Sequence, residues 1–385
     1  MIYLDAAATT PVRPEVLQAL WPVLAGTFGN PASHHEVGEG ARALLEDARR
    51  RVAAVLGCRP AEVLFTSGGT EADNAALKGI ALARRARDPR LDRVLISAIE
   101  HPAVVESAEY LARVHGFSVD VVPVDGQGVV RPEAFGALLG ERTAVASVMY
   151  ANNEVGTIQD LPALADLARQ AGVPLHSDAV QAAGALSLDV RELGVAALSL
   201  AGHKVGAPKG NGVLFLKART PFEALLHGGG QQRDRRSGTE DVAGAVAFAT
   251  ALELADAERQ AVEGLRSRRD RFIRAVQEAA PGAVLTGHPV ERLPGSASFC
   301  FPGVAGETVL LELERRGIVC SSGSACAAGS SEPSAVLTAL GIPADVALTA
   351  VRFSLQHDTS EEDLLTTARA VGEILTRLAP GTGTL

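Results

Sequence analysis

Seven short apolar runs, most of them separated by segments with helical spacing, fill residues 62–218. Strands that alternate with helices predict a mainly parallel sheet covered by helices on both faces. The connection between the last two runs is too short for a crossover helix, so one strand is expected to be antiparallel. The pattern predicts an α/β fold with a seven-stranded sheet, whose strands are EVLFTS (62–67), RVLISAI (93–99), SVDVVPV (118–124), AVASVMY (144–150), VPLHSDA (173–179), ALSLAG (197–202) and GVLFLKA (212–218).

The remaining segments predict how the chain is divided. An extended arm (1–12) precedes two helices, and Gly57 is a plausible stop for the second of them. After the loop 227–240 the pattern changes to a long helical stretch (241–280) that leads into new strands. We therefore expect a large domain at 13–254 and a smaller α+β domain at 255–385 that also takes the arm. The helices are expected at 13–24, 36–56, 71–87, 103–115, 132–140, 160–171, 306–316, 333–340 and 360–378, and the later strands at 296–301, 317–322 and 351–355.

Composition narrows the class of protein. Hydrophobic residues make up 47% of the 385 residues and charged residues 21%, which allows a sizeable core and argues against disorder. The net charge of −9 argues against nucleic-acid binding, since the arginines of 233–236 form only a local basic cluster. No basic leader, membrane-length apolar run or disulfide framework is visible, which indicates a cytoplasmic protein with reduced thiols.

Reactive side chains follow two neighbouring strands in the stretch Val173–Gly210. Asp178 and Gln181 come just after the first apolar run, and His203 and Lys204 after the second. Ligands of open α/β sheets bind outside the carboxyl ends of the strands. A carboxylate and a lysine at that edge can hold an aromatic nitrogen heterocycle and bind it covalently. The alternatives are a carboxylate that pairs with an arginine or caps the next helix, and a solvated lysine at a strand end.

The segment TSGGTEADN (66–74) lies between a predicted strand and a predicted helix. Glycines there let the backbone approach an anion, and the free N–H groups of a helix start favour a phosphate. Gly69 and Thr70 are the candidate ligands. An ordinary glycine turn with Thr70 as the helix N-cap fits this local sequence equally well.

Three further residues are candidates for the same site. The ring of His101, just past a strand, can stack on a heterocycle and take part in proton transfer. The guanidinium of Arg352 suits bidentate binding of a carboxylate, although a salt bridge between domains is the alternative. Asn153 follows another strand end, where its side chain would assist with the carboxylate or the ring.

One of the four cysteines lies in a segment of small residues, unlike the other three. Cys326 lies in SSGSACAAGSSEPS (321–334), a run of small residues without a nearby histidine or cysteine at metal-binding spacing. An accessible thiol with a pKa near ~8.5 is partly ionised at neutral pH and nucleophilic. Cys58, Cys300 and Cys320 are interpreted as structural. Together, a phosphate loop, an acid, a lysine, a stacking ring and a thiol point to pyridoxal phosphate.

With these motifs in place, the chain resembles the cysteine desulfurases of the class V aminotransferase group. The resemblance covers nearly the whole length, in order, and its SSGSAC loop is similar to the subgroup with a long cysteine loop. It implies a fold-type I pyridoxal-phosphate enzyme. The motifs that carry it are YLDAAATTP, GTFGNPAS, FTSGGTEADN, EHPAV, NNEVG, DAVQ, GHK with PKG, HGGGQQRDRRSGT, SSGSAC and EPS with VRFSL.

The resemblance also implies a role for each matching residue. Lys204 would bind the cofactor covalently, Asp178 would hold its ring nitrogen, Gln181 its ring oxygen, and His101 would stack on the ring. Gly69, Thr70 and His203 would bind the phosphate, together with Thr239 from the second subunit of a homodimer. Asn153 and Arg352 would hold the substrate carboxylate, and Cys326 would take the sulfur. The family usually has Ser where this chain has Ala201, which removes about one hydrogen bond to the phosphate, ~1–2 kcal/mol.

The implied activity is sulfur removal from L-cysteine, which gives L-alanine and a persulfide on Cys326. An iron–sulfur scaffold, a tRNA-thiolation protein or another sulfur carrier would accept this sulfur. No intrinsic metal is expected, although Cys326 could ligate an iron–sulfur cluster transiently. A selenocysteine lyase or class V aminotransferase is the first alternative, and a non-catalytic sulfur-carrier or assembly subunit is the second.

Overall fold

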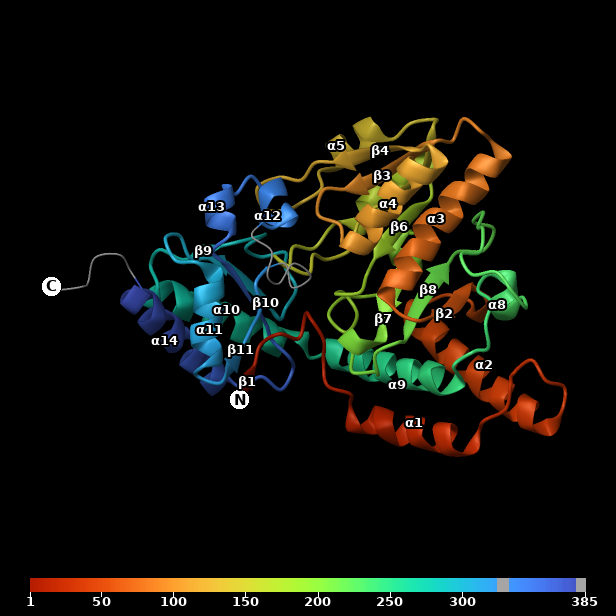
Figure 1. The fold of residues 1–385 in the computed structure, drawn as a ribbon, viewed down its shortest axis with the longest axis horizontal. Coiled ribbons are helices and arrows are strands. Elements are labelled where there is room, and N and C mark those ends of the chain that lie inside the picture. The colour runs from red at the N-terminus through yellow and green to blue at the C-terminus, as the bar shows by residue number, and fades with distance from the viewer. Residues whose placement is uncertain (324–331, 379–385) are drawn as a thin grey trace.

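A computed structural model describes residues 1–323 and 332–378, and its main element is a seven-stranded sheet (Figure 1). The strand order is β2-β8-β7-β6-β5-β3-β4. Strand β8 runs antiparallel to both of its neighbours, and the other pairs are parallel. All seven predicted strands are confirmed, as β2 (Val63–Thr66), β3 (Arg93–Ser97), β4 (Ser118–Val122), β5 (Thr143–Ser147), β6 (Leu175–Asp178), β7 (Ala197–Ala201) and β8 (Gly212–Leu216).

Both faces of this sheet are buried, which explains the nearly continuous apolar runs. Neighbouring residues of a strand point to opposite faces, so Leu95 of β3 joins one core while Val94 and Ile96 join another. Figure 1 shows α3 and α4 in front of the sheet and α9, α2 and α1 below it. The helices of this part are α1 (Pro14–Gly26), α2 (Glu36–Leu56), α3 (Gly69–Arg87), α4 (Pro102–His115), α5 (Pro132–Leu138), α6 (Leu161–Gln170), α7 (Val190–Leu193), α8 (Gln231–Asp234) and α9 (Val242–Arg259), with short 3-10 turns η1 (Pro60–Glu62) and η2 (Gly202–Lys204).

The later part of the chain forms a second core around a three-stranded antiparallel sheet, β12-β10-β9. The arm joins it, because β1 (Ile2–Tyr3) pairs with β11 (Ile318–Val319). The predicted stretch 241–280 is two helices, since α9 ends at Arg259 and α10 begins at Val262. The other elements are β9 (Val284–Leu285), β10 (Ser296–Cys300), β12 (Ala350–Ser354), α10 (Val262–Ala279), α11 (Gly306–Glu314), α12 (Ala335–Ala339), α13 (Ala344–Ala347) and α14 (Glu361–Leu378).

Local chemistry sets the helix ends. Gly57 ends α2 in the left-handed conformation (φ 63°), which glycine adopts without steric cost, and this confirms the predicted stop. His35 caps the start of the same helix, where its side chain accepts a hydrogen bond from the Gly38 N–H. Within the described residues, none of the helices has the length and apolar character needed to cross a membrane.

Candidate active site

The start of α3 presents backbone N–H groups without a side-chain cap. Gly68 is the N-cap residue and makes no side-chain capping bond, whereas Thr70 lies inside the first turn. Thr70 is therefore not the N-cap that the alternative interpretation required. A Cβ at the buried Gly69 would lie 2.8 Å from a methyl of Val180, so only glycine fits between α3 and the loop after β6. Such a helix start suits an anion.

Asp178 ends β6 and is 5% exposed. Its Oδ1 accepts a hydrogen bond from the Val180 N–H at 2.9 Å, so it caps the turn that follows, as one alternative anticipated. Burial raises the pKa of this carboxyl, and the contact with Val180 and the charges of His101 and Lys204 oppose the shift. A buried acid close to the Lys204 ammonium is suited to hold a protonated ring nitrogen.

Asp73 of α3 lies beside Asp178, and sequence reasoning missed it. Its side chain is 1% exposed, and its Oδ1 has no hydrogen-bond partner. Ligand atoms of Asp73, Asp178 and His101 lie within 4.8 Å of one another. Burial first, and then the charge of Asp178, raise the pKa of Asp73 well above its usual value. The one sign of Asp73 in the sequence was a carboxylate among the apolar residues of α3.

A buried histidine lies beneath this pair of carboxyls. His176 of β6 is 2.9 Å from the hydroxyls of both Ser147 and Ser199, and its Nε2 is 3.6 Å from Asp73. Burial lowers the pKa of His176 to about 3, so the ring is neutral at pH 7. Glu100 is also buried, and burial raises its pKa to about 7 while its Oε2 has no hydrogen-bond partner. The floor of the site therefore contains three acids and an uncharged histidine.

The arm passes directly over the candidate lysine, which sequence reasoning did not anticipate. Lys204 Nζ donates to the carbonyl oxygens of Ala7 at 2.5 Å and Ala8 at 2.8 Å. The side-chain amide of Gln181 donates to the same Ala7 oxygen at 3.0 Å. His203 lies 3.2 Å from the Thr9 hydroxyl, and burial, followed by the charge of Lys204, lowers the pKa of His203 to about 4. The arm thus fixes all three candidates.

His101 occupies the start of α4, where its Nδ1 accepts a hydrogen bond from the Ala103 N–H at 3.1 Å. Burial lowers the pKa of this ring, Asp178 raises it, and Lys204 lowers it further. Because Nδ1 accepts this hydrogen bond, the neutral ring carries its proton on Nε2.

Arg352 is 1% exposed and already has partners in the structure. It forms an ion pair with Asp5 at 2.8 Å and donates to the backbone oxygen of Asn153 at 3.0 Å, while its Nε has no partner. This ion pair joins Arg352 to the arm, which belongs to the same predicted domain, so it is not the salt bridge between domains that was the alternative. A cavity of about 390 Å³ lies nearby, and its lining includes Asn153, Gln181 and Lys204.

Cys326 lies outside the described residues, but both flanks of its segment are described. The Ser334 hydroxyl donates to Glu154 at 2.6 Å, and Gly323 packs closely against the same carboxyl. The other thiols have raised pKa values because they are buried, about 12 for Cys58 and Cys320 and about 11 for Cys300, which makes them poor nucleophiles.

Thr239 is not brought to the other candidates. It is exposed on the loop that follows α8, and it does not line the cavity beside Lys204. Figure 1 shows α8 next to the β2 edge of the sheet. Ala201, where the family usually has Ser, is buried at the end of β7.

The residues present fit pyridoxal phosphate. The uncapped start of α3 and the space that only Gly69 allows suit a phosphate, and Asp178 suits a protonated ring nitrogen. The unpartnered Asp73 Oδ1 marks this as a site where polar groups are incompletely satisfied by the protein itself. Buried polar atoms are rarely left without partners, and functional sites are the usual exceptions.

The fold and this site define the class to which the protein belongs. A family model described as Aminotransferase class-V matches residues 2–366, and the chain belongs to that family.

The relatives that follow are all named as cysteine desulfurases. The chain is 45% identical to "IscS-like cysteine desulfurase" of Mycobacterium tuberculosis (94% of this chain, 93% of the relative) and 42% identical to "Cysteine desulfurase NifS" of Azotobacter vinelandii (98% and 93%). It is 40% identical to "Cysteine desulfurase IscS" of Dictyoglomus turgidum (98% and 95%). A solved structure titled "NIFS-LIKE PROTEIN" superposes with a TM-score of 0.90 at 35% identity, covering 98% of this chain and 99% of that one.

Proposed function

We propose that this chain is a pyridoxal-phosphate-dependent cysteine desulfurase. The observation that carries the proposal is the meeting of Lys204, Asp178 and His101 at the strand ends, in a chain whose relatives are cysteine desulfurases. A solved structure titled "SspA in complex with cysteine", 30% identical with a TM-score of 0.81 over 92% of this chain and 99% of that one, supports the proposed substrate.

We assign the cofactor contacts by residue. Lys204 would bind the cofactor covalently, Asp178 would hold its ring nitrogen, and His101 would stack on its ring. Gln181 would contact the ring oxygen, and Asn153 the substrate carboxylate. Gly69, Thr70 and His203 would hold the phosphate, with Thr239 of a second subunit. The uncapped start of α3 and the neutral His203 support the phosphate assignment, because both offer N–H donors.

When bound, pyridoxal phosphate supplies an electron sink that weakens the Cα–H bond of an amino acid. The Lys204 amine would take the Cα proton, and the carbonyl oxygens of Ala7 and Ala8 lie within its hydrogen-bonding reach. His101 would move the thiol proton of the substrate, because its ring lies beside Asp178 and its Nδ1 already accepts from the Ala103 N–H. Arg352 binds the substrate carboxylate, and Asp5 and the Asn153 carbonyl hold its guanidinium in place.

The bonds, electrons and protons of the sulfur transfer balance without an added oxidant. The Cys326 thiolate attacks the substrate Sγ, an S–S bond forms, and the substrate Cβ–S bond breaks. The electron pair of that bond goes to Cβ, which takes a proton and becomes the methyl group of alanine. The products are L-alanine and a Cys326 persulfide.

We further propose a cytoplasmic homodimer with a large domain at 13–254, a small domain at 255–385 that takes the arm, and a long cysteine loop. Continuity of α9 from Val242 to Arg259 means that a helix spans this boundary. The persulfide would pass to an iron–sulfur scaffold or another sulfur carrier, and no nucleic acid or membrane partner is proposed. Cys326 could ligate a transferred cluster transiently, which is the only metal contact proposed.

Alanine and sulfide release from L-cysteine tests the proposal, with wild type compared with Cys326→Ser and Lys204→Ala. We expect Cys326→Ser to keep the yellow bound cofactor and lose sulfur transfer, and Lys204→Ala to lose the covalently bound cofactor. Sulfide formation by Cys326→Ser at the wild-type rate would refute the role of the thiol. Full-rate transamination by that variant would favour the aminotransferase alternative, and a protein that never binds the cofactor would favour a non-catalytic carrier.

A further inference from the structure

The loop 227–240 contains three successive residues in an unusual backbone conformation. Gln232, Arg233 and Asp234 have φ values of 49°, 60° and 61°. Side chains other than glycine rarely adopt this left-handed conformation, and it persists only where surrounding contacts impose it. The short element α8 is therefore not an ordinary right-handed helix turn. Contacts with the rest of the protein must therefore hold residues 232–234 in this conformation.

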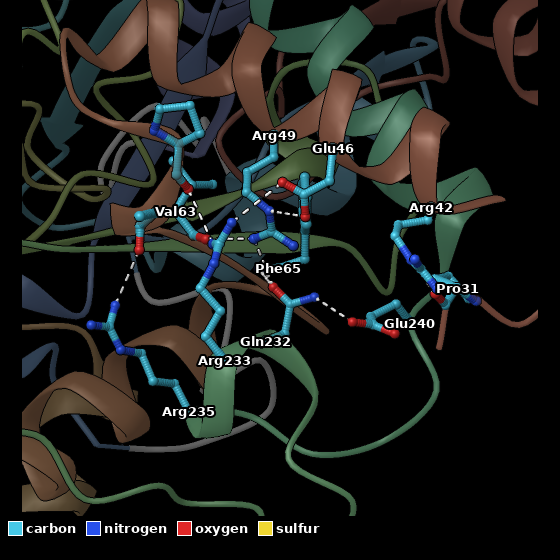
Figure 2. Close-up of polar contacts among 12 residues, drawn as sticks. Pro31, Arg42, Glu46, Arg49, Val63, Phe65, Gln232, Arg233, Arg235 and Glu240 are labelled. Carbon is cyan, nitrogen blue, oxygen red and sulfur yellow. Dashed lines mark hydrogen bonds and ion pairs between the residues drawn. The ribbon is translucent and has the colours of Figure 1, made fainter. Parts of the chain in front are cut away.

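Gln232 is the residue that ties this segment to the sheet (Figure 2). Its side chain is 5% exposed, and its Oε1 accepts hydrogen bonds from the Phe65 N–H at 3.1 Å and from Arg49 Nη1 at 2.9 Å. Its Nε2 donates to Glu240 at 3.3 Å. Strand β2 is the edge strand of the sheet, so the Phe65 N–H has no neighbouring strand on this side. The amide of Gln232 supplies the missing acceptor.

Arg49 completes this edge from the side of α2. It is 2% exposed, its Nη1 also donates to the Val63 oxygen at 2.6 Å, and its guanidinium lies 5.2 Å from the Phe65 ring centroid. Glu46 accepts from its Nε at 3.1 Å. A buried cation needs such partners, so Arg49 and Gln232 depend on each other.

The outer part of the loop is braced as well. Gln231 accepts a hydrogen bond from the Gly238 N–H at 2.9 Å, and Ser237 accepts one from the Gly230 N–H at 3.3 Å. Arg236 pairs with Glu71, in the first turn of α3, at 2.8 Å. These contacts extend to Gly238, and the next residue, Thr239, is exposed. They fix the loop on both sides of Arg235 and leave Thr239 exposed.

We infer that Gln232 is a positioning residue that, through its contact with Arg49, fixes the left-handed loop and so presents Thr239 to the phosphate site of a second copy of this chain. The inference rests on the proposed function, in which Thr239 acts in the partner's site. The new element is that contacts at the β2 edge of one protomer set the affinity of its partner for the cofactor. Gln232 itself does not touch the cofactor.

Mixed dimers with a single lysine-bearing site separate this role from a general loss of stability. Two differently tagged full-length chains are expressed together, and dimers that carry both tags are purified, stripped of cofactor and titrated with pyridoxal phosphate. Absorbance of the covalently bound cofactor reports affinity only at the site that has Lys204. One dimer pairs Lys204→Ala with Gln232→Leu, and the other pairs wild type with the double variant Lys204→Ala, Gln232→Leu.

The two dimers contain the same substitutions and differ only in which loop reaches the lysine-bearing site. We expect wild-type affinity in the first dimer, because that site receives an intact loop. In the second dimer the site receives the altered loop, and we expect affinity to fall about tenfold, as for loss of a hydrogen bond to a charged phosphate. Gln232→Glu keeps the oxygen acceptor for Phe65 and Arg49 but loses the donor to Glu240, so it should recover only part of the lost affinity. Gln260→Leu, on the exposed end of α9, is the matched control.

Equal affinity in the two mixed dimers would overturn the inference, and so would a loss confined to the first dimer. Thr239→Ala in place of Gln232→Leu tests the proposed function separately. If Thr239→Ala weakens the partner's site and Gln232→Leu does not, the positioning role is wrong while the proposed function stands. If Thr239→Ala weakens only the site of its own chain, the shared site itself is wrong.

Discussion

Two buried polar clusters of this protein are built in opposite ways. Beneath the candidate active site, Asp73 and Glu100 each leave a buried oxygen without a partner. At the β2 edge, Arg49 and Gln232 leave no buried side-chain atom without a partner in the described chain. The described protein atoms leave acceptors of the first cluster without a hydrogen bond, whereas they satisfy the side chains of Arg49 and Gln232 in the second.

This difference indicates that the first cluster binds a ligand and the second holds a loop in place. Burial shifts the pKa values of Asp73, Asp178 and Glu100 upward, which costs stability and keeps the site ready for a cationic ring. The contacts of Arg49 instead compensate for its burial and hold a loop. Substitutions in the first cluster should therefore alter chemistry or relieve the cost of burying an acid, whereas removal of Arg49 in the second should lower stability.

Asp178→Ala gives the largest effect expected from either cluster. Removal of this acid should lower the rate of alanine formation by about 10²–10³-fold, as for loss of a preorganised charge next to the reacting group. The melting temperature of the cofactor-free protein should change little, because removal of a buried carboxyl that is costly to ionise offsets the loss of the acceptor for the Val180 N–H. Steady-state kinetics and thermal denaturation check both parts. A normal rate would contradict the assignment of Asp178.

Arg49→Ala should show the reverse behaviour. It leaves the Val63 oxygen and the Gln232 amide short of a donor and creates a cavity, so the free energy of unfolding should fall by about 2–4 kcal/mol. Urea denaturation measures this change, with Arg50→Ala on the exposed face of α2 as the control. An unchanged free energy of unfolding would contradict the supporting role of the edge cluster.

Asp73→Asn should produce a smaller, pH-dependent gain in stability. Burial raises the pKa of Asp73 in the folded state above its unfolded value, so the wild type is destabilised as pH rises above about 4. The advantage of the Asn variant should be absent below that pH and grow by up to about 1.4 kcal/mol per pH unit until Asp73 ionises in the folded state. Denaturation of the cofactor-free protein at several pH values measures it, with the exposed Asp166→Asn as the control. A pH-independent difference would contradict the raised pKa.

The strands and most helices follow from the sequence because both faces of the sheet are buried, which forces apolar runs of recognisable length. Residues that act at strand ends, such as Asp178 and Lys204, are predictable for the same reason. The long-range contacts are not. Nothing in the pattern around Ala7 shows that the arm lies over Lys204, or that Asp5 pairs with Arg352 across 347 residues.

Polar residues on buried helix faces were also missed. Asp73 looks like an ordinary polar residue of α3 until its packing against the strands is known. Gln232 looks like part of a polar loop, because positive φ angles at residues other than glycine leave no signal in the sequence. In both cases tertiary contacts decide the role of the residue.

The central claim is that sulfur from L-cysteine is transferred to Cys326 by a site built on Lys204. Mass spectrometry of thiol-containing peptides after a single turnover tests it most directly. We predict one added sulfur atom on Cys326, none on Cys58, Cys300 or Cys320, and none on any thiol in Lys204→Ala. Alanine formation with Cys326 unmodified, or sulfur on Cys326 in the Lys204→Ala protein, would contradict the account.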